Sequence, residues 1–224
     1  MSMLIEVVRP ASPKAAYHVL VRHEKGYQNL KDISDPRQFG KEALSAIQNL
    51  ARQNSPQGFR VLMRAGEYGR QLDGEPLSLE FLGGEIIRPE IRSLYDPSKE
   101  LSPSEVDKKP DADCVFDKIV SGQIPVPPLF KDAQVFVFKP NQMLAKEHLL
   151  FIPTQHYRDI LGVTDPDFFG SVFAKIAEFA QKEEFTGGFM LASNNGPWGG
   201  QAVQHLHFHM RGGEKFESPF WQDW

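Results

Sequence analysis

Asp35-Pro36-Arg37-Gln38-Phe39-Gly40 recurs 130 residues later as Asp165-Pro166-Asp167-Phe168-Phe169-Gly170. The same offset places Gly66-x-x-Gly69-x-Gln71 on Gly196-x-x-Gly199-x-Gln201. Single matches arise by chance at any offset, but two multi-residue patterns in one register rarely do. The chain is therefore predicted to contain two copies of one fold.

Both copies show the same expected order of elements. An Asp-Pro pair provides a helix N-cap followed by proline at the first helical position. Apolar residues then recur at helical spacing, and runs rich in β-formers flank the helix, at 18–22 and 59–63 in the first copy and at 148–152 and 189–192 in the second. One helix among neighbouring strands predicts the α+β class with an antiparallel sheet.

Prolines and polar residues separate the two copies. The stretch 93–112 is polar and contains Pro97, Pro103 and Pro110, so we expect a linker that runs over the surface. The predicted division is a first copy at 1–92, a linker at 93–112 and a second copy at 113–224.

Composition and charge bear on the cellular compartment and on the classes of partner that the protein can bind. The 224 residues contain one cysteine and carry a formal net charge of −4. One cysteine cannot form an internal disulfide, and the N-terminal residues show no basic region followed by an apolar one, so we expect a cytoplasmic protein without a signal peptide. The sequence has no apolar run of about 18 residues, which predicts no membrane helix. The mild negative charge argues against broad electrostatic binding of nucleic acid or membrane.

Three histidines alternate with apolar residues in His205-Leu206-His207-Phe208-His209-Met210. On a β-strand this alternation places the imidazoles on one face and the apolar side chains on the core face. At the offset of 130, the first copy has Glu75, Leu77 and Leu79 instead of the imidazoles. Because one copy folds without this triad, the triad is predicted to be functional and the first copy degenerate.

This segment resembles the signature of the histidine triad (HIT) family, His-φ-His-φ-His-φ-φ with φ apolar, except that Arg211 occupies the last position. Its surroundings are similar to the nucleotide-binding Hint branch, because residues 199–204, Gly-Gly-Gln-Ala-Val-Gln, precede the triad and Gly212-Gly213 follows it. Residues 116–125 and 148–153 also resemble the first helix and a strand of that branch. The resemblance covers residues 113–215 and implies a HIT-like fold.

The resemblance implies hydrolysis at the α-phosphorus of a nucleotide. By position, His207 would attack and form a nucleotidyl-histidine, from which water would release the nucleoside monophosphate. His205 would hydrogen-bond behind the nucleophile, and His209 would contact the phosphate and help the leaving group. His148 would belong to the supporting network. The phosphate or leaving group would be held by loop residues: Asn194, Gly199, Gly200 and Gln201.

The resemblance also implies an apolar slot for the nucleobase. Two departures from the family pattern bear on the substrate: Pro140 stands where an Asp commonly holds the ribose, and Ala202 where a Ser commonly contacts the phosphate. Both changes allow a different substrate or a weak enzyme. Five residues would line the slot, although each has an alternative interpretation as ordinary core: Val115, Phe116, Ile119, Ile124 and Phe138.

No cofactor is expected, and zinc is the less favoured alternative. Some bacterial relatives carry Cys-x-x-Cys at the front of the domain as zinc ligands, and here Cys114 and Asp117 occupy those places. His156 and His205 would complete such a site. We interpret Cys114 as a small buried hydrophobe and His156 as a surface residue.

Two further functions stay open. A non-catalytic nucleotide-binding protein is favoured by the degenerate first copy and by Pro140. A nucleotidyltransferase is the other, although that branch of the family usually carries Gln where this chain has His209. In each case the expected partner is a small nucleotide, with neither nucleic acid nor membrane.

Hint proteins are commonly homodimers, and this property bears on the role of the first copy. The resemblance implies that the first copy packs on the second as an internal dimer partner, which forms a pseudo-dimer within one chain. His18 and His23, the two histidines of the first copy, are interpreted as structural.

Overall fold

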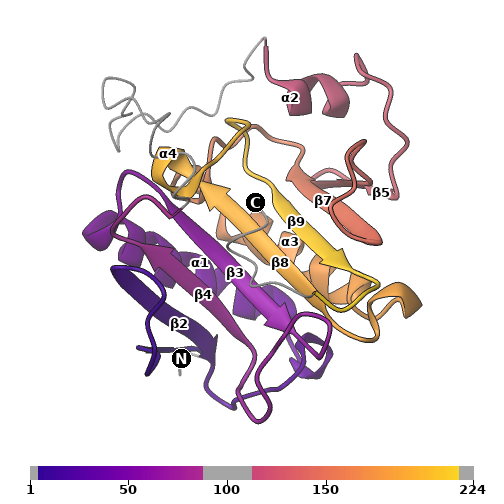
Figure 1. Ribbon diagram of the computed structural model, residues 1–224. Coiled ribbons are helices and arrows are strands. Elements are labelled where there is room, and N and C mark those ends of the chain that lie inside the picture. The colour runs from indigo at the N-terminus through magenta and orange to yellow at the C-terminus, as the bar shows by residue number, and fades with distance from the viewer. Residues whose placement is uncertain (1–4, 88–112, 217–224) are drawn as a thin grey trace.

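In a computed structural model, the chain forms one continuous antiparallel sheet flanked by helices (Figure 1). The structure describes residues 5–87, here termed the first unit, and residues 113–216, the second unit. The predicted linker at 93–112 lies outside the described residues. The strand order is β1-β2-β4-β3-β8-β9-β7-β6-β5, so each unit contributes one half of the sheet. The predicted α+β class with an antiparallel sheet is confirmed.

The strands are β1 (Ile5–Val8), β2 (Tyr17–His23), β3 (Phe59–Ala65), β4 (Ser78–Gly83), β5 (Phe130–Lys131), β6 (Val135–Phe138), β7 (Glu147–Pro153), β8 (Phe189–Asn195) and β9 (Phe208–Gly212). The α-helices are α1 (Pro36–Asn54), α2 (Val115–Val120), α3 (Pro166–Phe179) and α4 (Gly196–Gly199), and short 3₁₀ turns occupy Leu30–Asp32, Ile160–Gly162 and Glu183–Phe185.

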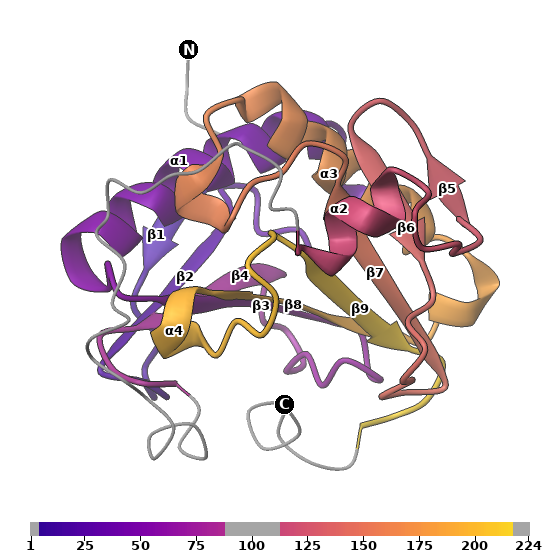
Figure 2. The same ribbon diagram turned by 90° about the horizontal axis from the view of Figure 1, so that it is seen from above.

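Both long helices begin as the sequence predicts. The Asp35 carboxylate accepts a hydrogen bond from the N–H of Gln38, and the Asp165 carboxylate accepts one from the N–H of Asp167, each at 2.9 Å. A proline follows each cap, where its missing N–H leaves no helical hydrogen bond unmade. The two helices lie side by side on one face of the sheet (Figure 2), and the main apolar core lies between them and the strands.

The two units meet at β3 and β8 in the middle of the sheet. Phe59 is paired with Asn195 at one end of the antiparallel register, which is centred on the pair Leu62 and Ala192. Those two central residues are themselves 130 apart in the sequence. The pairing therefore relates the two units by a pseudo-twofold axis through its centre.

Equivalent glycines allow α1 and α3 to cross closely. A Cβ on Gly40 would lie 2.7 Å from the Cβ of Phe173, and a Cβ on Gly170 would lie 2.6 Å from the carbonyl oxygen of Arg37. Neither contact is sterically possible for a larger residue without moving a helix. The repeated Asp-Pro-x-x-Phe-Gly pattern thus encodes both the helix start and the point where the units touch.

The offset between the units changes by one residue before their last strands. His18 of β2 is paired with Leu82 of β4, whereas His148 of β7 is paired with Arg211 of β9. Equivalent positions of β4 and β9 are therefore 129 residues apart, since 211 − 82 = 129. The first unit has one more residue between its loop glutamine and its last strand, and a shift of one residue exchanges the two faces of a strand.

The prediction that Glu75, Leu77 and Leu79 replace the imidazoles is therefore wrong. Leu77 and Leu79 point into the main core, as Leu206 and Phe208 do in the second unit. The counterparts of the triad in the first unit are, in the order of His205, His207 and His209, the residues Pro76, Ser78 and Glu80.

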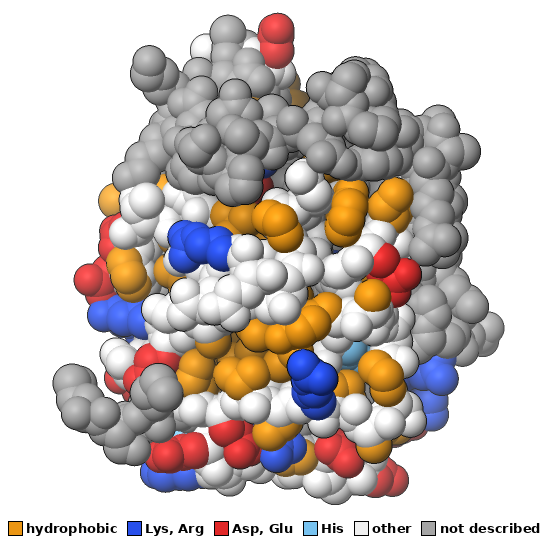
Figure 3. Space-filling view, turned by 90° about the vertical axis from the view of Figure 1, so that its left-hand side faces the viewer, with side chains coloured by type: hydrophobic (Ala, Val, Ile, Leu, Met, Phe, Trp, Pro, Cys, Tyr) orange, Lys and Arg blue, Asp and Glu red, His pale blue; other side chains and the backbone are white. Residues whose placement is uncertain are grey.

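The surface gives further information on possible partners. Among the described residues, no helix is both long and apolar enough to cross a membrane. On the face shown in Figure 3, acidic and basic side chains are interspersed with apolar ones. The described side chains of that face do not form a basic stripe of the kind that follows a phosphate backbone.

Gly40→Ala tests the close helix crossing. We expect it to lower the free energy of unfolding by up to about 2 kcal/mol, because overpacking the contact with Phe173 costs about 1–3 kcal/mol and the better helix propensity returns only about 1 kcal/mol. Urea denaturation measures the change. Ser45→Ala, on the exposed side of α1, is the matched control and should be neutral or slightly stabilising. A Gly40→Ala protein as stable as this control would show that the units do not need the close approach.

Candidate active site

The triad lies where the last strand of the second unit begins. β9 begins at Phe208, so only His209 is inside the strand, and His205 and His207 lie in the extended segment before it. The apolar residues between the histidines belong to the main core. The imidazoles therefore occupy the opposite face of the sheet, as the alternation predicts.

A backbone carbonyl orients the ring of His207. Its Nδ1 lies 2.7 Å from the carbonyl oxygen of His205. A carbonyl only accepts hydrogen bonds, so Nδ1 carries the proton and Nε2 carries a lone pair. Burial lowers the pKa of His207 below its ordinary value, which keeps the ring neutral near pH 7. The result is an imidazole with a fixed tautomer and a nucleophilic Nε2.

His148 contacts His209 and not His207. Nδ1 of His148 accepts a hydrogen bond from the N–H of Leu144 at 3.3 Å, and its Nε2 lies 2.9 Å from Nδ1 of His209. His148 therefore donates through Nε2, and His209 in turn carries its proton on Nε2. Burial is the main cause that lowers the pKa of His148 to about 4 and that of His209 well below its usual value. Both rings are neutral donors at pH 7.

Asn194 connects the triad with the first unit. It lies on β8, beside the extended segment that carries His207. Its side-chain oxygen accepts a hydrogen bond of 2.7 Å from Nε of Arg60, which is fully buried on β3. The sequence did not indicate a role for Arg60, because Arg60 belongs to the copy without a triad and reaches Asn194 only through the pairing of β3 with β8.

Gln201 braces the glycine-rich loop. Its Oε1 accepts from the N–H of Gly196 at 2.8 Å, and its Nε2 donates to the carbonyls of Arg158 and Val203 at 2.5 and 2.9 Å. These bonds hold the loop closed between β8 and the triad. The side-chain amide is thus engaged with the backbone on both its oxygen and its nitrogen.

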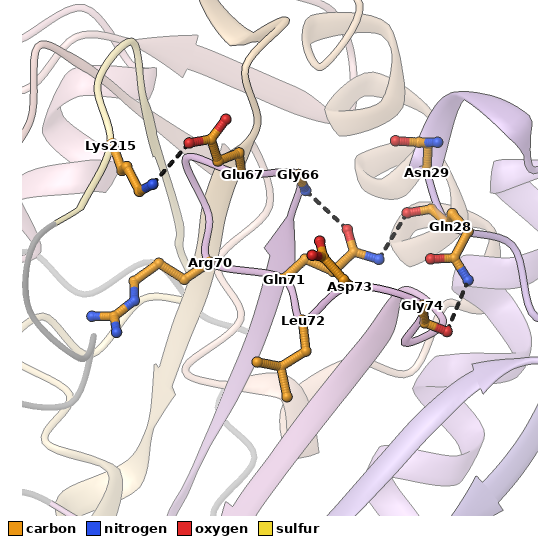
Figure 4. Close-up of a pocket in the computed structure, with 10 residues that line it drawn as sticks. All are labelled: Gln28, Asn29, Gly66, Glu67, Arg70, Gln71, Leu72, Asp73, Gly74 and Lys215. Atoms are coloured by element: carbon orange, nitrogen blue, oxygen red, sulfur yellow. Dashed lines mark hydrogen bonds and ion pairs between the residues drawn. The ribbon is translucent and has the colours of Figure 1, made fainter.

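Gln71 makes the equivalent bonds in the first unit, to the N–H of Gly66 and the carbonyl of Gln28, each at 2.9 Å (Figure 4). Because a unit without a triad keeps this arrangement, the brace belongs to the fold. The contact of Gln201 with a phosphate stays a prediction.

The predicted phosphate-binding glycines lie against the first unit. A Cβ on Gly199 would lie 2.2 Å from the carbonyl oxygen of Phe59 on β3. Gly200 has a φ of +75°, in the left-handed region, where a side chain is disfavoured. The loop is therefore shaped by the neighbouring unit, and its role toward a phosphate stays a prediction.

Most of the predicted nucleobase residues belong to one apolar cluster next to the triad. The ring of Phe116 lies 5.4 Å from that of His207 and 6.2 Å from that of Phe138, centroid to centroid. Ile119 is buried in the same cluster and Ile124 packs on its edge. Val115 is 38% exposed and lies outside the cluster. The structure therefore brings four of the five predicted residues together.

A family model described as HIT domain matches residues 121–216. Protein HitA of Neisseria gonorrhoeae is 36% identical over 102 residues, which cover 44% of this chain and 94% of HitA. The chain belongs to the HIT family. Adenylylsulfatase HINT1 of Arabidopsis thaliana is 32% identical over 115 residues, covering 49% of this chain and 77% of HINT1.

One solved structure is similar over both units of this HIT protein. It is described as a uridylyltransferase, covers 97% of this chain and 77% of its own, and superposes with a TM-score of 0.65 at 14% identity. At that identity the likeness concerns the fold alone. The two-unit arrangement is therefore one that another protein also adopts.

Four side chains at the front of the HIT unit fit a metal ion. Cys114, Asp117, His156 and His205 bring their ligand atoms within 4.8 Å of one another. Nε2 of His205 lies 3.0 Å from the carbonyl oxygen of Pro153 and must donate to it, so Nδ1 carries a lone pair. That lone pair faces the thiol of Cys114 at 3.6 Å and the Asp117 carboxylate at 3.3 Å. A cation between these atoms would replace the thiol proton and bind the lone pair and the carboxylate together.

One sulfur, two nitrogens and a carboxylate form a donor set that zinc accepts in tetrahedral sites. Zinc there would hold α2 against the segment before β9, behind the triad. The interpretation of His156 as a surface residue is wrong: it is only 5% exposed, and its Nδ1 lies 2.8 Å from Asp117. The sequence did not predict the contact between His156 and Asp117, because residues 153–157 show no local sign of burial.

The first unit repeats the contact between His148 and His209 with different residues. Nδ1 of His18 accepts from the N–H of Lys14 at 3.1 Å, and its Nε2 lies 3.3 Å from the carboxylate of Glu80. Lys14 and Arg64 form ion pairs with the same carboxylate. The sequence did not reveal this cluster, because the offset of 130 aligns Glu80 with the core residue Met210.

The charges around Glu80 make it a stabilising carboxylate. Burial raises its pKa, but the hydrogen bond with His18 and the charges of Arg64 and Lys14 outweigh burial and hold the pKa at about 2. A carboxylate whose pKa is lower in the folded chain stabilises the fold above its unfolded pKa and loses that contribution as the pH falls.

Glu80→Gln tests this contribution. At pH 7 we expect the variant to lose about 3 kcal/mol of unfolding free energy, which is the size of the pKa difference between the unfolded and folded chain. The difference from the wild type should shrink between about pH 4.5 and pH 2, because the wild-type carboxylate is protonated there as well. Urea titrations across this range measure it, with the exposed Glu24→Gln as control. A difference independent of pH would contradict the ionised state of Glu80.

Proposed function

We propose that this HIT protein is a nucleotide hydrolase that acts at the α-phosphorus through a nucleotidyl-histidine on His207. The single observation that carries the proposal is the hydrogen bond from Nδ1 of His207 to a backbone carbonyl, which leaves Nε2 as a nucleophile. Family membership supports it, and HINT1, a relative, is named an adenylylsulfatase.

In the first step, the lone pair on Nε2 of His207 attacks the α-phosphorus. An N–P bond forms, and the bond from phosphorus to the leaving group breaks. The leaving group takes its electron pair and a proton from water or from the bound substrate. The Nε2–H of His209 hydrogen-bonds to the leaving atom, which stabilises the charge that develops on it.

In the second step, water attacks the same phosphorus and loses a proton to the solvent, and the N–P bond breaks. The electron pair returns to Nε2 of His207 and the nucleoside monophosphate leaves. Two displacements with the imidazole as a covalent intermediate replace one difficult displacement by water. His148 keeps His209 in the donor tautomer throughout both steps.

Substrate positioning follows from the residues around the triad. The N–H groups of Gly199 and Gly200 and the amide of Asn194 would bind phosphate oxygens, and the base would lie against Phe116 and its apolar neighbours. Pro140 stands where the family commonly has the ribose-binding Asp, and the neighbouring Lys139 is already paired with Glu147 at 2.8 Å. We therefore expect weak selection at the ribose.

The first unit would act as the internal dimer partner of the active unit. β3 occupies the edge of β8, and Arg60 of β3 hydrogen-bonds Asn194. Arg60 is thus a positioning residue that the first unit supplies to the second. Its fixed charge also adds to the field that acts on a phosphate near the triad.

Nucleotidyl transfer is a second candidate, because the uridylyltransferase structure has the same two-unit fold. In that case an acceptor other than water would attack the intermediate on His207. His209 favours hydrolysis, since the transferases of this family usually have Gln there. Adding inorganic phosphate as an acceptor distinguishes the two, because transfer yields a nucleoside diphosphate.

His207→Ala tests the nucleophile. The wild-type chain should hydrolyse at least one of three substrates: an adenosine phosphoramidate, a diadenosine polyphosphate or adenylyl sulfate. Intact-mass and peptide mass spectrometry at neutral pH should detect a nucleotidyl adduct on His207. The variant should lose turnover by at least about 10³-fold and still bind the nucleotide. His23→Gln, in the first unit, is the control and should remain active. Absence of both adduct and turnover in the wild type would leave a nucleotide-binding protein.

Arg60→Met tests the contribution of the first unit. Loss of the charge-assisted hydrogen bond to Asn194 should reduce kcat/KM by about 10–100-fold, the equivalent of 1.5–3 kcal/mol, with the larger part in kcat. Met190→Leu, at the pseudo-symmetric position, is the packing control, and thermal melting of both variants checks the fold. Unchanged kcat/KM in a folded Arg60→Met protein would remove Arg60 from the site.

A further inference from the structure

The first unit contains a cavity at the place that the triad occupies in the second unit. Its volume is about 290 Å³, and its polar lining includes Lys14, His18, Arg64 and Glu80. The strand pairing makes His18 the counterpart of His148 and Glu80 the counterpart of His209. The first unit thus has a cavity at the position equivalent to the triad, although it lacks the three histidines.

The residues of this cavity cannot carry out the chemistry of the triad. Ser78 stands in the place of the nucleophile His207, and its hydroxyl donates to the carbonyl of Pro76 at 3.0 Å. In return, Arg64 stands where the second unit has Asn194, and Lys14 where it has Leu144. The first unit therefore has no imidazole nucleophile at this place, and it has two cationic side chains that line the same space.

The charges of the cavity favour an anion. Three cationic residues, Lys14, Arg64 and Arg70, line it against two carboxylates, Glu75 and Glu80. One carboxylate oxygen of Glu80 receives the donors of Arg64. The five N–H donors of a guanidinium exceed what a single oxygen accepts, and the same fork binds phosphate well.

A buried imidazole nitrogen also faces this space. The side chain of His18 is only 1% exposed, and its Nε2 lies 3.3 Å from the carboxylate of Glu80. Its Nδ1 accepts a hydrogen bond from the N–H of Lys14, so Nε2 carries a proton and points at that carboxylate. A ligand in the cavity would therefore lie beside a fixed imidazole donor as well as the cationic side chains.

The remaining walls set the size of the ligand. Leu20, Leu72 and Pro10 give the cavity an apolar side. A volume near 300 Å³ is the lower end for small-molecule sites, which are mostly apolar with a few polar groups that fix orientation. A larger pocket of about 720 Å³ (Figure 4) shares Arg70, Gln71 and Leu72 with this cavity.

We propose that this cavity, here termed the first-unit site, binds a small organic phosphate without cleaving it. Lys14 and Arg64 hold the phosphoryl group, and the apolar wall receives the organic part. The ligand class is a phosphomonoester of the size of a nucleoside monophosphate. The site does not depend on an active triad, so its occupancy is measurable whether or not the chain hydrolyses nucleotides.

Hydrogen exchange with mass spectrometry on the full chain separates the two sites, with adenosine monophosphate as the probe. Saturating probe should slow exchange in peptides 10–20 and 70–80, and inorganic phosphate should compete for this protection. Adenosine without phosphate should not protect them. Protection confined to the triad segments, or equal protection by adenosine, would overturn the proposal.

Two variants make the test specific. Arg64→Met and Lys14→Met should each weaken the apparent Kd for protection of peptides 10–20 and 70–80 at least tenfold, while protection around residues 205–212 stays as in the wild type. Lys14→Met leaves Arg64 paired with Glu80, so it keeps the test valid if Arg64→Met fails to fold. Lys25→Ala removes an exposed charge of the same unit and is the matched control. An unchanged Kd in the folded Lys14→Met protein would overturn the proposal.

Discussion

An unpaired strand edge presents a row of backbone N–H and C=O groups that must find partners, and β8 meets this requirement through β3. Two features of the site depend on that pairing. It fixes the loop with Gly199 against β3, and it brings Arg60 within 2.7 Å of Asn194. The crossing of α1 and α3 at two glycines is the matching contact on the helical face. The active unit is thus shaped on one side by a unit that has no triad.

Much of the fold could be predicted from the sequence, because the signals were local and repeated. Asp35 and Asp165 cap helices that begin where the Asp-Pro pairs stand, and the apolar residues between the triad histidines pack in the core. The triad itself follows from alternation alone. These predictions needed only spacing along the chain, and the duplication allowed the two helix starts to be checked against each other.

The errors came from contacts that spacing does not encode. One additional residue before β4 exchanges the faces of that strand, so an alignment without a gap paired Glu80 with Met210 and concealed its relation to His209. His156 is buried because α2 brings Asp117 to it from 39 residues away in the sequence. Arg60 belongs to the site only through pairing between the units. In each case the missing information was three-dimensional contact between distant segments.

The pseudo-twofold axis through Leu62 and Ala192 has a consequence for how such a protein can change. In a homodimer, one substitution in the gene appears on both sides of the axis, so a residue that helps one site must also be tolerated at its image. Here the two sides of the axis are encoded by different parts of the sequence. Arg60 on β3 faces the second unit, whereas the residue at its symmetric position on β8 is Met190. Likewise, Glu80 stands in the first unit where the second unit has His209. Because the two halves are separate stretches of one chain, a residue on either strand of the central pair can change without the same change at its symmetric position.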